Sequence, residues 1–374
     1  MNFEQGPIRP PSEADSLFVR VTRNCPWNKC LFCHVYKGKK FSRRTIEEIK
    51  DDILAMEKGA SRVESYALKL DSSGRINREV LEYIYHREPD LLQIAFWLYR
   101  GGKNVFLQDG DNLVMPADQL AEVLYFIKEQ FPTVERITTY TRARTAGRRS
   151  IAELKMLKEA GLTRVHVGLE TGCNPLLDYM RKGITAEEHI EAGIKIKEAG
   201  LSLSEYVILG LGGRKMWKEH ALETAKVLSK IDPNFIRLRT LAIREDVPLL
   251  EKVQAGEFHP SNDDEIVMEE KLLLENLSGT GYLVSDHILN LLEDVEGNLV
   301  QDIPNMLGVI DSYLRLPAEE RANFCLGRRL GIYRYIRDMQ DTERYEQVKK
   351  LKKLLHESGQ DQNEFLIQYR GNFI

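Results

Sequence analysis

Short apolar runs alternate with longer amphipathic segments between residues 17 and 241. The apolar runs predict buried β-strands, and the segments in which apolar residues recur every three or four positions predict helices that bury one face. Six strands are expected, at residues 17–21, 105–107, 137–140, 165–169, 206–209 and 235–241. Helices are expected to begin at Ile46, Ala117, Ile151 and Ala186, with another at 217–228. This alternation is a βα repeat.

Polar residues and glycines mark the ends of several predicted helices. Three residue pairs fit the capping box, in which the first turn of a helix satisfies its own free amide groups. These pairs are Thr45 with Glu48, Ser150 with Glu153, and Thr185 with Glu188. Gly161 and Gly200 are expected to end two helices, because glycine readily adopts the left-handed backbone of a C-terminal cap.

Strands joined by helical crossovers imply a parallel sheet, either doubly wound or closed into a full or partial βα barrel. Both arrangements place functional residues at the carboxyl ends of the strands. Extra helices are expected within residues 64–100. Residues 1–15 are expected to form an extended arm, 16–248 the core, and 249–374 a mostly helical region. Helices in that last region are predicted at 265–277, 286–292, 303–314, 318–326 and 341–356.

Composition and charge narrow the function. The chain has 374 residues, 43% of them hydrophobic, and a formal net charge of −4. No apolar run is long enough to cross a bilayer and no signal peptide is evident, so a cytoplasmic location without membrane association is expected. A slightly acidic chain does not suggest a nucleic-acid partner. The basic cluster of Arg142, Arg144, Arg148 and Arg149 is either a phosphate-binding group or a solvated loop rim.

Three of the five cysteines, Cys25, Cys30 and Cys33, lie in one loop directly after the first strand. Clustered thiols in a cytoplasmic chain indicate a metal site rather than disulfides. Three thiolates can bind three irons of a cubane cluster and leave the fourth iron open to a small chelating molecule. The alternatives are a zinc site completed by His34, or buried thiols without a metal.

This loop resembles the signature of the radical S-adenosylmethionine (SAM) superfamily, C-x3-C-x2-C after the first barrel strand. The first gap here has four residues, not three. The resemblance implies two cofactors, a [4Fe–4S] cluster on the three cysteines and SAM. It also implies that Phe32, just before the last cysteine, packs near the adenine of SAM.

Later strand ends carry further parts of the resemblance. The segment 106–111 resembles the small-residue motif that receives the amino group of SAM, which implies roles for Asp109, Gly110 and Asp111; an ordinary Asp-Gly turn is the alternative. The segments 165–172 and 180–183 resemble a Gly-Leu-Glu-Ser-Gly signature followed by Lys-Gly. These occur in tRNA methylthiotransferases, the elongator catalytic subunit and oxygen-independent coproporphyrinogen oxidases. Glu170 is therefore expected to accept hydrogen bonds from the ribose or amino group of SAM.

The fifth and sixth strands extend the list of candidate SAM contacts. Residues 206–213 resemble the apolar-then-glycine motif that approaches adenine, with Gly210 at the strand end. The SAM carboxylate is expected to meet Arg142, or Arg237 or Arg239; contact with solvent or structural salt bridges are equal alternatives. The resemblance covers residues 15–245 and implies a partial (β/α)6 barrel. The C-terminal region is also similar to uncharacterised radical SAM proteins of anaerobes.

The resemblance implies an enzyme that cleaves SAM to a 5′-deoxyadenosyl radical, which abstracts hydrogen from a small-molecule substrate. An electron donor such as flavodoxin or ferredoxin is the expected partner. A haem chaperone related to the coproporphyrinogen oxidases and an RNA-modifying enzyme are the alternatives. Without another cysteine cluster, no second [4Fe–4S] cluster is expected.

Substrate contacts are expected from Cys173 and from residues 285–290. Cys173 either donates a hydrogen atom or packs in the core. His287 and Asn290 are expected to lie on one face of the helix predicted at 286–292, and to offer a proton donor and an amide. Ser285 or Asp286 serves as its N-cap or as a further polar contact.

Overall fold

The computed structural model describes residues 3–372, and the chain divides into two compact units. Unit 1 contains the residues up to Trp27, Gly38–Val167 and Ile194–Leu203, and unit 2 contains Asn28–Lys37, Gly168–Gly193 and the residues from Ser204 onward. Three elements begin in one unit and end in the other: β6 (Leu162–Glu170), α8 (Ala186–Glu198) and β7 (Ser202–Leu209).

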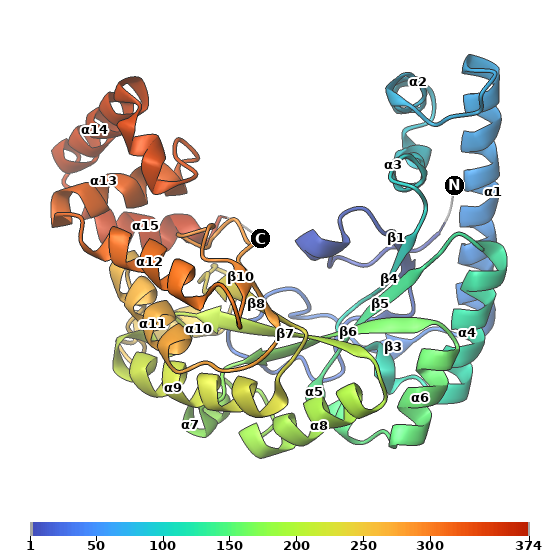
Figure 1. Ribbon diagram of the computed structural model, residues 1–374, viewed down its shortest axis with the longest axis horizontal. Coiled ribbons are helices and arrows are strands. Elements are labelled where there is room, and N and C mark those ends of the chain that lie inside the picture. Colours follow the sequence, from blue (N-terminus) through green and yellow to red (C-terminus); the bar gives the residue numbers. More distant parts are fainter. Residues whose placement is uncertain (1–2, 373–374) are drawn as a thin grey trace. The chain divides into compact units, whose positions relative to one another are not determined.

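Unit 1 is built on parallel strands in the order β1 (Leu17–Arg20), β4 (Asn104–Gln108), β5 (Arg136–Thr141) and β6 (Figure 1). Leu17 pairs with Val105, and Val105 pairs with Ile137. Each of these three side chains is buried. Parallel strands are covered on both faces, which explains why they appear in the sequence as continuous apolar runs.

The helices of unit 1 are α1 (Ile46–Leu70), α2 (Arg78–Arg87), α3 (Leu92–Tyr99), α4 (Ala117–Gln130), α5 (Ala143–Gly147) and α6 (Ile151–Glu159). The long helix α1 packs against α2, α3 and α4 (Figure 1). The extra helices expected within residues 64–100 are therefore α2 and α3. A small antiparallel pair, β2 (Thr22–Arg23) and β3 (Ser42–Arg43), flanks the cysteine loop in sequence.

Unit 2 contains β7, β8 (Phe235–Thr240) and β9 (Tyr282–Val284) as parallel neighbours, and β10 (Gly297–Asn298) pairs antiparallel with β9. Its helices are α7 (Asn174–Tyr179), α9 (Gly213–Ile231), α10 (Leu249–Gln254), α11 (Asp263–Glu275), α12 (Ile303–Leu314), α13 (Ala318–Arg329), α14 (Thr342–Glu357) and α15 (Gln362–Arg370). Short 3-10 helices lie in unit 1 at Pro11–Glu13, Pro89–Leu91 and Asn112–Val114, and in unit 2 at Ile336–Gln340. The region after residue 249 is mostly helical, as expected, but it also contributes the two short strands.

All six predicted strands are present, and so are the predicted helix caps. Thr45 with Glu48 and Ser150 with Glu153 form complete capping boxes. The Thr185 amide donates to the Glu188 carboxylate, and the Glu188 amide donates to the Thr185 hydroxyl. Gly161 and Gly200 have φ angles of 119° and 76°, and each follows the end of a helix. The caps are local in sequence, which is why the pattern could predict them.

The helix predicted at 286–292 is wrong, because these residues form an irregular loop. Side chains from elsewhere bind its backbone carbonyls, which a helix would use internally. Arg329 donates to the Leu289 carbonyl, and Arg328 donates to the carbonyls of Asn290 and Leu291. The leucines of the segment are buried without helical pairing, so their spacing suggested a helix that tertiary contacts override.

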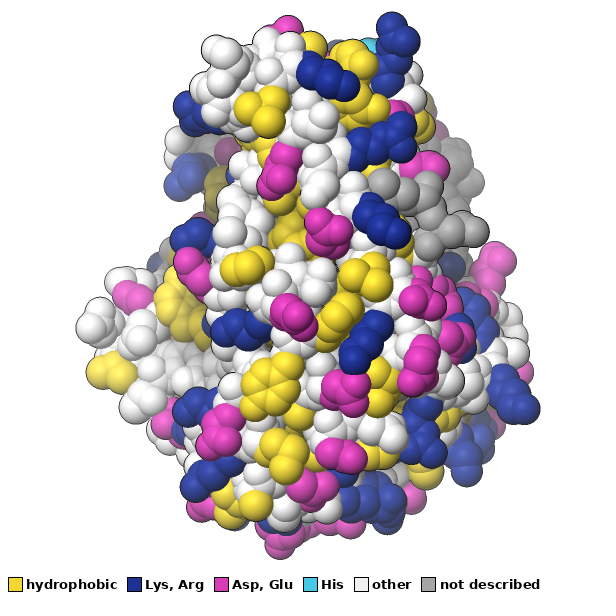
Figure 2. Space-filling model, turned by 90° about the vertical axis from the view of Figure 1, so that its right-hand side faces the viewer, with side chains coloured by type: hydrophobic (Ala, Val, Ile, Leu, Met, Phe, Trp, Pro, Cys, Tyr) yellow, Lys and Arg dark blue, Asp and Glu magenta, His cyan; other side chains and the backbone are white. Residues whose placement is uncertain are grey.

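No helix among residues 3–372 is long and apolar enough to cross a membrane. On the face drawn in Figure 2, Lys and Arg side chains are interspersed with Asp and Glu side chains, and neither charge forms a continuous field. That face therefore resembles an ordinary hydrated protein surface.

Candidate functional site

The end of β4 in unit 1 carries the first candidate ligand-binding group. Asp109 follows the strand with φ = 85°, in the left-handed region that non-glycine residues rarely adopt. Its side chain is fully buried, and its Oδ2 accepts a hydrogen bond from Arg20 Nε at 2.5 Å. Its Oδ1 has no hydrogen-bond partner among residues 3–372. A buried acceptor without a partner is costly, so Oδ1 is suited to an ammonium or hydroxyl donor from a ligand.

Asp111 has a different role, because protein donors engage both of its oxygens. Oδ1 accepts from the Thr141 hydroxyl at 2.7 Å and from the Arg142 amide at 3.2 Å, and Oδ2 accepts from the Thr145 hydroxyl at 2.6 Å. Burial raises the pKa of Asp111, while these hydrogen bonds oppose the rise. Asp111 therefore ties the end of β4 to the end of β5. Gly110, between the two aspartates, is half-buried.

Arg142 begins α5, directly after β5. Its guanidinium lies 4.9 Å from the centre of the Trp27 ring, two residues beyond Cys25 in the same unit. This cation–π contact fixes one candidate SAM contact beside the start of the cysteine loop. Arg149, from the same basic cluster, donates to the carbonyls of Leu113 and Met115 and therefore has a structural role.

The cysteine loop has the donors that an iron–sulfur cluster requires. Cys25, Cys30 and Cys33 form no disulfide, and they lie half-buried in a stretch without helix or strand. Cys25 belongs to unit 1, and the other two belong to unit 2. Within the described residues, no three His, Cys, Asp or Glu side chains are grouped closely enough to hold a metal ion. Three soft thiols so close in sequence fit iron, and their joint binding of a cluster remains a prediction.

Backbone hydrogen bonds hold the second half of the cysteine loop in unit 2. The Leu31 amide donates to the Met180 carbonyl at 3.1 Å, and the Leu249 amide donates to the Leu31 carbonyl at 3.0 Å. Phe32 is thereby placed against a buried apolar cluster, and Lys182 Nζ lies 5.9 Å from the centre of its ring. The loop between Cys30 and Cys33 is therefore held from both sides.

Glu170 and Lys182 form an ion pair beside this part of the loop. Glu170 ends β6 with φ = 64°, and its Oε1 accepts from Lys182 Nζ at 2.8 Å. The two side chains are only 14% and 11% exposed, so the carboxylate is held rather than solvated. A Cβ atom at Gly168 would lie 2.1 Å from Glu170 Oε1, so any larger residue there would force the ion pair to move. Lys182 belongs to the recognised Lys-Gly motif, but its pairing was not evident from the sequence.

Cys173 is packed rather than exposed. Its thiol belongs to a buried cluster with Leu31, Leu176, Met180 and Leu211. Burial raises its pKa, and the nearby Glu223 and Glu219 raise it further, so the thiol stays protonated. Of the two interpretations of Cys173, these contacts favour packing, and a hydrogen-donor role remains a prediction.

Gly210, at the end of β7, is held by a carboxyl group that the sequence analysis missed. Gly210 has φ = 80°, and its amide donates to Glu269 Oε1 of α11 at 2.7 Å. Burial raises the pKa of Glu269 to about 8. Glu269 lies three residues after Ile266 and four before Leu273, which places it on the apolar face of its helix. This spacing could have identified Glu269 from the sequence as a buried carboxyl group.

His220 lies beside Glu269 in the same buried group. Its Nδ1 lies 2.8 Å from the Thr171 hydroxyl, and its Nε2 lies 3.0 Å from the Ile208 carbonyl. A carbonyl only accepts, so Nε2 carries the proton and Nδ1 accepts from Thr171. Burial lowers the pKa of His220 to about 4, so the ring is neutral. Thr171 follows Glu170, and His220 therefore links the ends of β6 and β7 within unit 2.

Replacing Glu269 with glutamine is expected to stabilise the protein at alkaline pH. Burial raises the pKa of Glu269 from its ordinary 4.5 to about 8, so the folded state keeps a proton that the unfolded state releases. The stability that the protonated Glu269 side chain contributes is fully present below pH 4.5 and is lost as the pH rises through about 8. Relative to wild type, E269Q should gain more than about 1 kcal/mol in unfolding free energy between pH 5 and pH 9.

Urea unfolding at both pH values measures this difference. Glu275→Gln, which changes an exposed carboxylate on the same helix, is the control and should show no such gain. A pH-independent difference between E269Q and wild type would contradict the protonated state of Glu269.

The residues expected to contact substrate at 285–290 are mostly engaged in structural bonds. Asn290 is buried; its Nδ2 donates to the Leu238 carbonyl and to the Ser285 hydroxyl, and its Oδ1 accepts from the Thr240 hydroxyl. It thus ties this loop to β8. The expected helical face shared with His287 does not exist, because the segment is a loop.

His287 is the remaining candidate of that segment. Its Nδ1 is buried without a hydrogen-bond partner among the described residues. Burial, followed by the neighbouring Arg239, lowers the pKa of His287 to about 3. The ring is therefore neutral near pH 7. His287 was expected to be a proton donor, but a neutral ring can only donate a hydrogen bond from one nitrogen and accept one at the other.

Asp286 binds both arginines of β8 that were candidates for the SAM carboxylate. Its oxygens accept from Arg237 Nη1 and Arg239 Nη1, each at 2.8 Å. The structural salt bridge, which was one alternative in the sequence analysis, is present for both Arg237 and Arg239. Arg142, the remaining candidate, lies in unit 1, where its guanidinium contacts the Trp27 ring.

Several of these strand ends lie in a part of the chain that matches a known protein family. The family model described as the radical SAM superfamily matches residues 75–225. This part of the chain is similar to radical SAM proteins. The matched range contains Asp109, Arg142, Glu170 and Gly210, while the cysteine loop lies before it. The predicted fold class, a partial (β/α)6 barrel type with a mostly helical C-terminal region, is confirmed. Radical SAM proteins are enzymes that bind a [4Fe–4S] cluster and cleave SAM by radical chemistry.

The curated proteins similar to this chain match only part of it. Over 123 residues it is 27% identical to the tRNA uridine(34) acetyltransferase of Methanocaldococcus jannaschii, covering 31% of this chain and 21% of that protein. The chain thus spans about a fifth of the length of that relative.

Two solved structures are similar at low identity. Elp3 of Methanocaldococcus infernus, with an N-terminal deletion, has 17% identity and a TM-score of 0.43, covering 62% of this chain and 60% of that chain. Coproporphyrinogen III oxidase (HemN) of Escherichia coli has 14% identity and a TM-score of 0.39, covering 84% of this chain and 74% of that chain.

Proposed function

We propose that this radical SAM enzyme generates a 5′-deoxyadenosyl radical that abstracts hydrogen from a small-molecule substrate. Cys25, Cys30 and Cys33 would hold the cluster, which when bound would supply the electron for breaking the sulfonium bond of SAM. The observation that carries the proposal is in unit 2, where the loop with Cys30 and Cys33 is held by Met180 and Leu249, close to the Glu170–Lys182 ion pair.

The protein side chains bind and orient SAM in this proposal. In unit 1, Asp109 Oδ1 accepts from the ammonium group, and Arg142 binds the carboxylate. In unit 2, Glu170 accepts from the ribose hydroxyls, and Phe32 with the backbone at Gly210 contacts adenine. His287 contributes a neutral ring, and Cys173 supports Phe32 by packing. A cytoplasmic location, where thiols stay reduced, completes the proposal.

Release of 5′-deoxyadenosine tests this function. Anaerobically reconstituted protein, given SAM and dithionite, is expected to form 5′-deoxyadenosine, measured by liquid chromatography. Reduced flavodoxin or ferredoxin should replace dithionite. Protein reconstituted without iron is the control. No 5′-deoxyadenosine above that control, from protein with a full cluster, would contradict the proposal.

An RNA substrate is the second candidate, because the matched relative from M. jannaschii is a tRNA uridine(34) acetyltransferase. The acidic net charge and the mixed charges in Figure 2 favour a small molecule over RNA. Bulk tRNA and a protein-free metabolite extract can each be added to this assay. Faster 5′-deoxyadenosine formation with tRNA, and no increase in rate with the extract, would select RNA. No contact among residues 3–372 favours the haem-chaperone alternative.

A further inference from the structure

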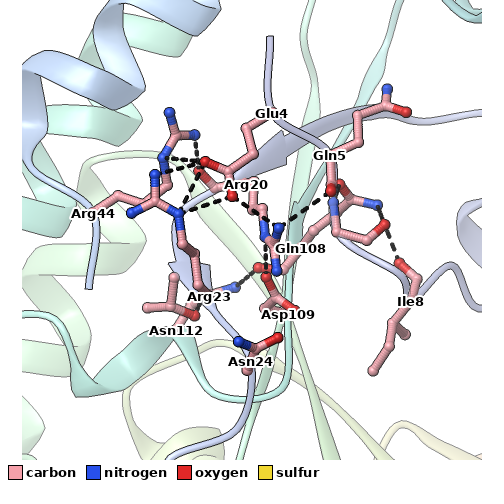
Figure 3. A network of polar contacts seen from close by, with 12 residues as sticks. Glu4, Gln5, Ile8, Arg20, Arg23, Asn24, Arg44, Gln108, Asp109 and Asn112 are labelled. Carbon is pink, nitrogen blue, oxygen red and sulfur yellow. Dashed lines mark hydrogen bonds and ion pairs between the residues drawn. The ribbon is translucent and has the colours of Figure 1, made fainter. Parts of the chain in front are cut away.

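The segment Glu4–Ile8 lies against the end of β4 in unit 1 (Figure 3). The Gly6 amide donates to Gln108 Oε1 at 2.7 Å, and Gln108 Nε2 donates to the carbonyls of Gly6 and Ile8, each at 3.2 Å. A Cβ atom at Gly6 would lie 3.2 Å from Asp109 Oδ2, so glycine permits this close approach. The segment has no helix or strand of its own and is held by these side-chain contacts.

Three arginines converge on the Glu4 carboxylate (Figure 3). Oε1 accepts from Arg20 Nη1 and from Arg23 Nε, each at 2.8 Å, and Oε2 accepts from Arg23 Nη2 at 2.6 Å. Arg44 Nε lies farther away, 3.5 Å from Oε2. These guanidinium groups come from β1, β2 and the residue preceding the cap of α1, so three separate elements fix them.

Each arginine also has a carboxylate partner of its own. Arg20 binds Asp109 at 2.5 Å, Arg23 binds Glu48 at 2.9 Å, and Arg44 binds Asp52 at 2.5 Å. Three arginines with three carboxylates are already balanced, so Glu4 is a fourth, surplus anion. The guanidinium groups would keep their places without it, and their converging N–H donors would then face an open position.

Glu4 fills that position incompletely. Arg44 is 4% exposed, and its Nε is buried without a hydrogen bond that meets normal geometry. A carboxylate has two oxygens, and both are engaged by Arg20 and Arg23. A phosphoryl group has a third oxygen that can reach the remaining donor, and planar guanidinium groups bind phosphate well.

We propose that Arg20, Arg23 and Arg44 form a binding site for the phosphoryl group of a ligand, and that the Glu4 carboxylate occupies it when no ligand is bound. Glu4 competes as an internal ligand, because a group on the same chain acts at an effective concentration in the millimolar range. Phosphate must therefore bind weakly to wild-type protein and more tightly once Glu4 is removed. The site adjoins one proposed SAM contact, because Arg20 also binds Asp109, but phosphate binding can be measured without SAM.

Inorganic phosphate is the probe, titrated calorimetrically into the full-length, anaerobically reconstituted protein in phosphate-free buffer. Glu4→Ala and the milder Glu4→Gln are expected to lower the apparent Kd for phosphate at least about tenfold. Glu122→Ala, which removes an exposed carboxylate paired with Lys50 in the same unit, is the control and should change nothing. Arg44→Lys, added to Glu4→Ala, keeps the charge but removes Nε and should reverse the gain.

Gly6→Leu provides an independent test, because it displaces the segment without altering any group that binds phosphate. It should also raise phosphate affinity. Propionate, which has two oxygens like Glu4, should bind Glu4→Ala more weakly than phosphate does. Equal binding of propionate and phosphate would overturn the phosphoryl assignment. No saturable phosphate binding by folded Glu4→Ala or Glu4→Gln protein would overturn the site itself.

Discussion

Alanine in place of any one of Cys25, Cys30 and Cys33 is expected to abolish SAM cleavage and the iron-dependent visible absorption. Wild-type protein should bind about four iron and four sulfide per chain after anaerobic reconstitution. Three thiolates in one loop provide no spare ligand, so losing one leaves two irons without their protein ligands. Iron and sulfide analysis with absorption spectra measures the loss independently of activity.

The chain offers a matched control for these variants in its two other cysteines. Cys173 and Cys325 are buried thiols, and Cys325 lies 3.0 Å from the Tyr313 hydroxyl. Cys325→Ala should keep the full cluster, and Cys173→Ala should keep it too because that thiol lies in a buried apolar cluster outside the cysteine loop. Stoichiometric zinc without visible absorption in reconstituted wild-type protein would instead support the zinc site that the sequence left open.

The strand and cap predictions succeeded where the signal is local. A continuous apolar run such as that of β4 is what a strand covered on both faces requires. Capping boxes depend on residues three positions apart, so Thr45 and Glu48 could be paired without knowing the fold. The sheet's order and its short additions could not be predicted, because β9 and β10 have only three and two residues.

The segment 285–292 shows where local patterns are insufficient. Its leucines have helical spacing, but its carbonyls are bound by Arg328 and Arg329, more than thirty residues later in the chain. No residue near Asn290 in the sequence indicates that its side-chain amide binds both β8 and Ser285. Long-range side-chain contacts to the backbone override helix propensity here.

The candidate site divides in the same way. Strand ends were predictable, and so were the polar residues on them, such as Asp109 and Glu170. Their partners were not, because Arg20 reaches Asp109 from another strand and Glu269 reaches Gly210 from a helix. The role of a carboxylate depends on those partners: Asp111 is satisfied by the protein, whereas Asp109 retains a buried oxygen without one.

Glu170→Ala is expected to weaken SAM binding about ten- to a hundredfold while leaving the cluster intact. Losing a charge-assisted hydrogen bond costs about 1.5–3 kcal/mol, which corresponds to that range of affinity. The carboxylate is held by Lys182 and is mostly buried, so little reorganisation is needed before it accepts a ligand hydroxyl. Equilibrium dialysis with SAM and iron analysis of the same samples measure both outcomes. Glu187→Ala, which removes an exposed carboxylate of the same unit, is the control.

Gly168→Ala separates the position of Glu170 from its charge. A methyl group there would lie 2.1 Å from Glu170 Oε1 and 3.0 Å from Lys182 Nζ, so the ion pair must move although both residues remain. The contact is with side-chain ends rather than backbone, so the fold should survive while SAM affinity falls nearly as far as in Glu170→Ala. Because both changes act on one group, the double variant should bind SAM no more weakly than Glu170→Ala alone. Additive losses in the double variant would show that Gly168 acts through something other than Glu170, and wild-type affinity in both single variants would remove Glu170 from the SAM site.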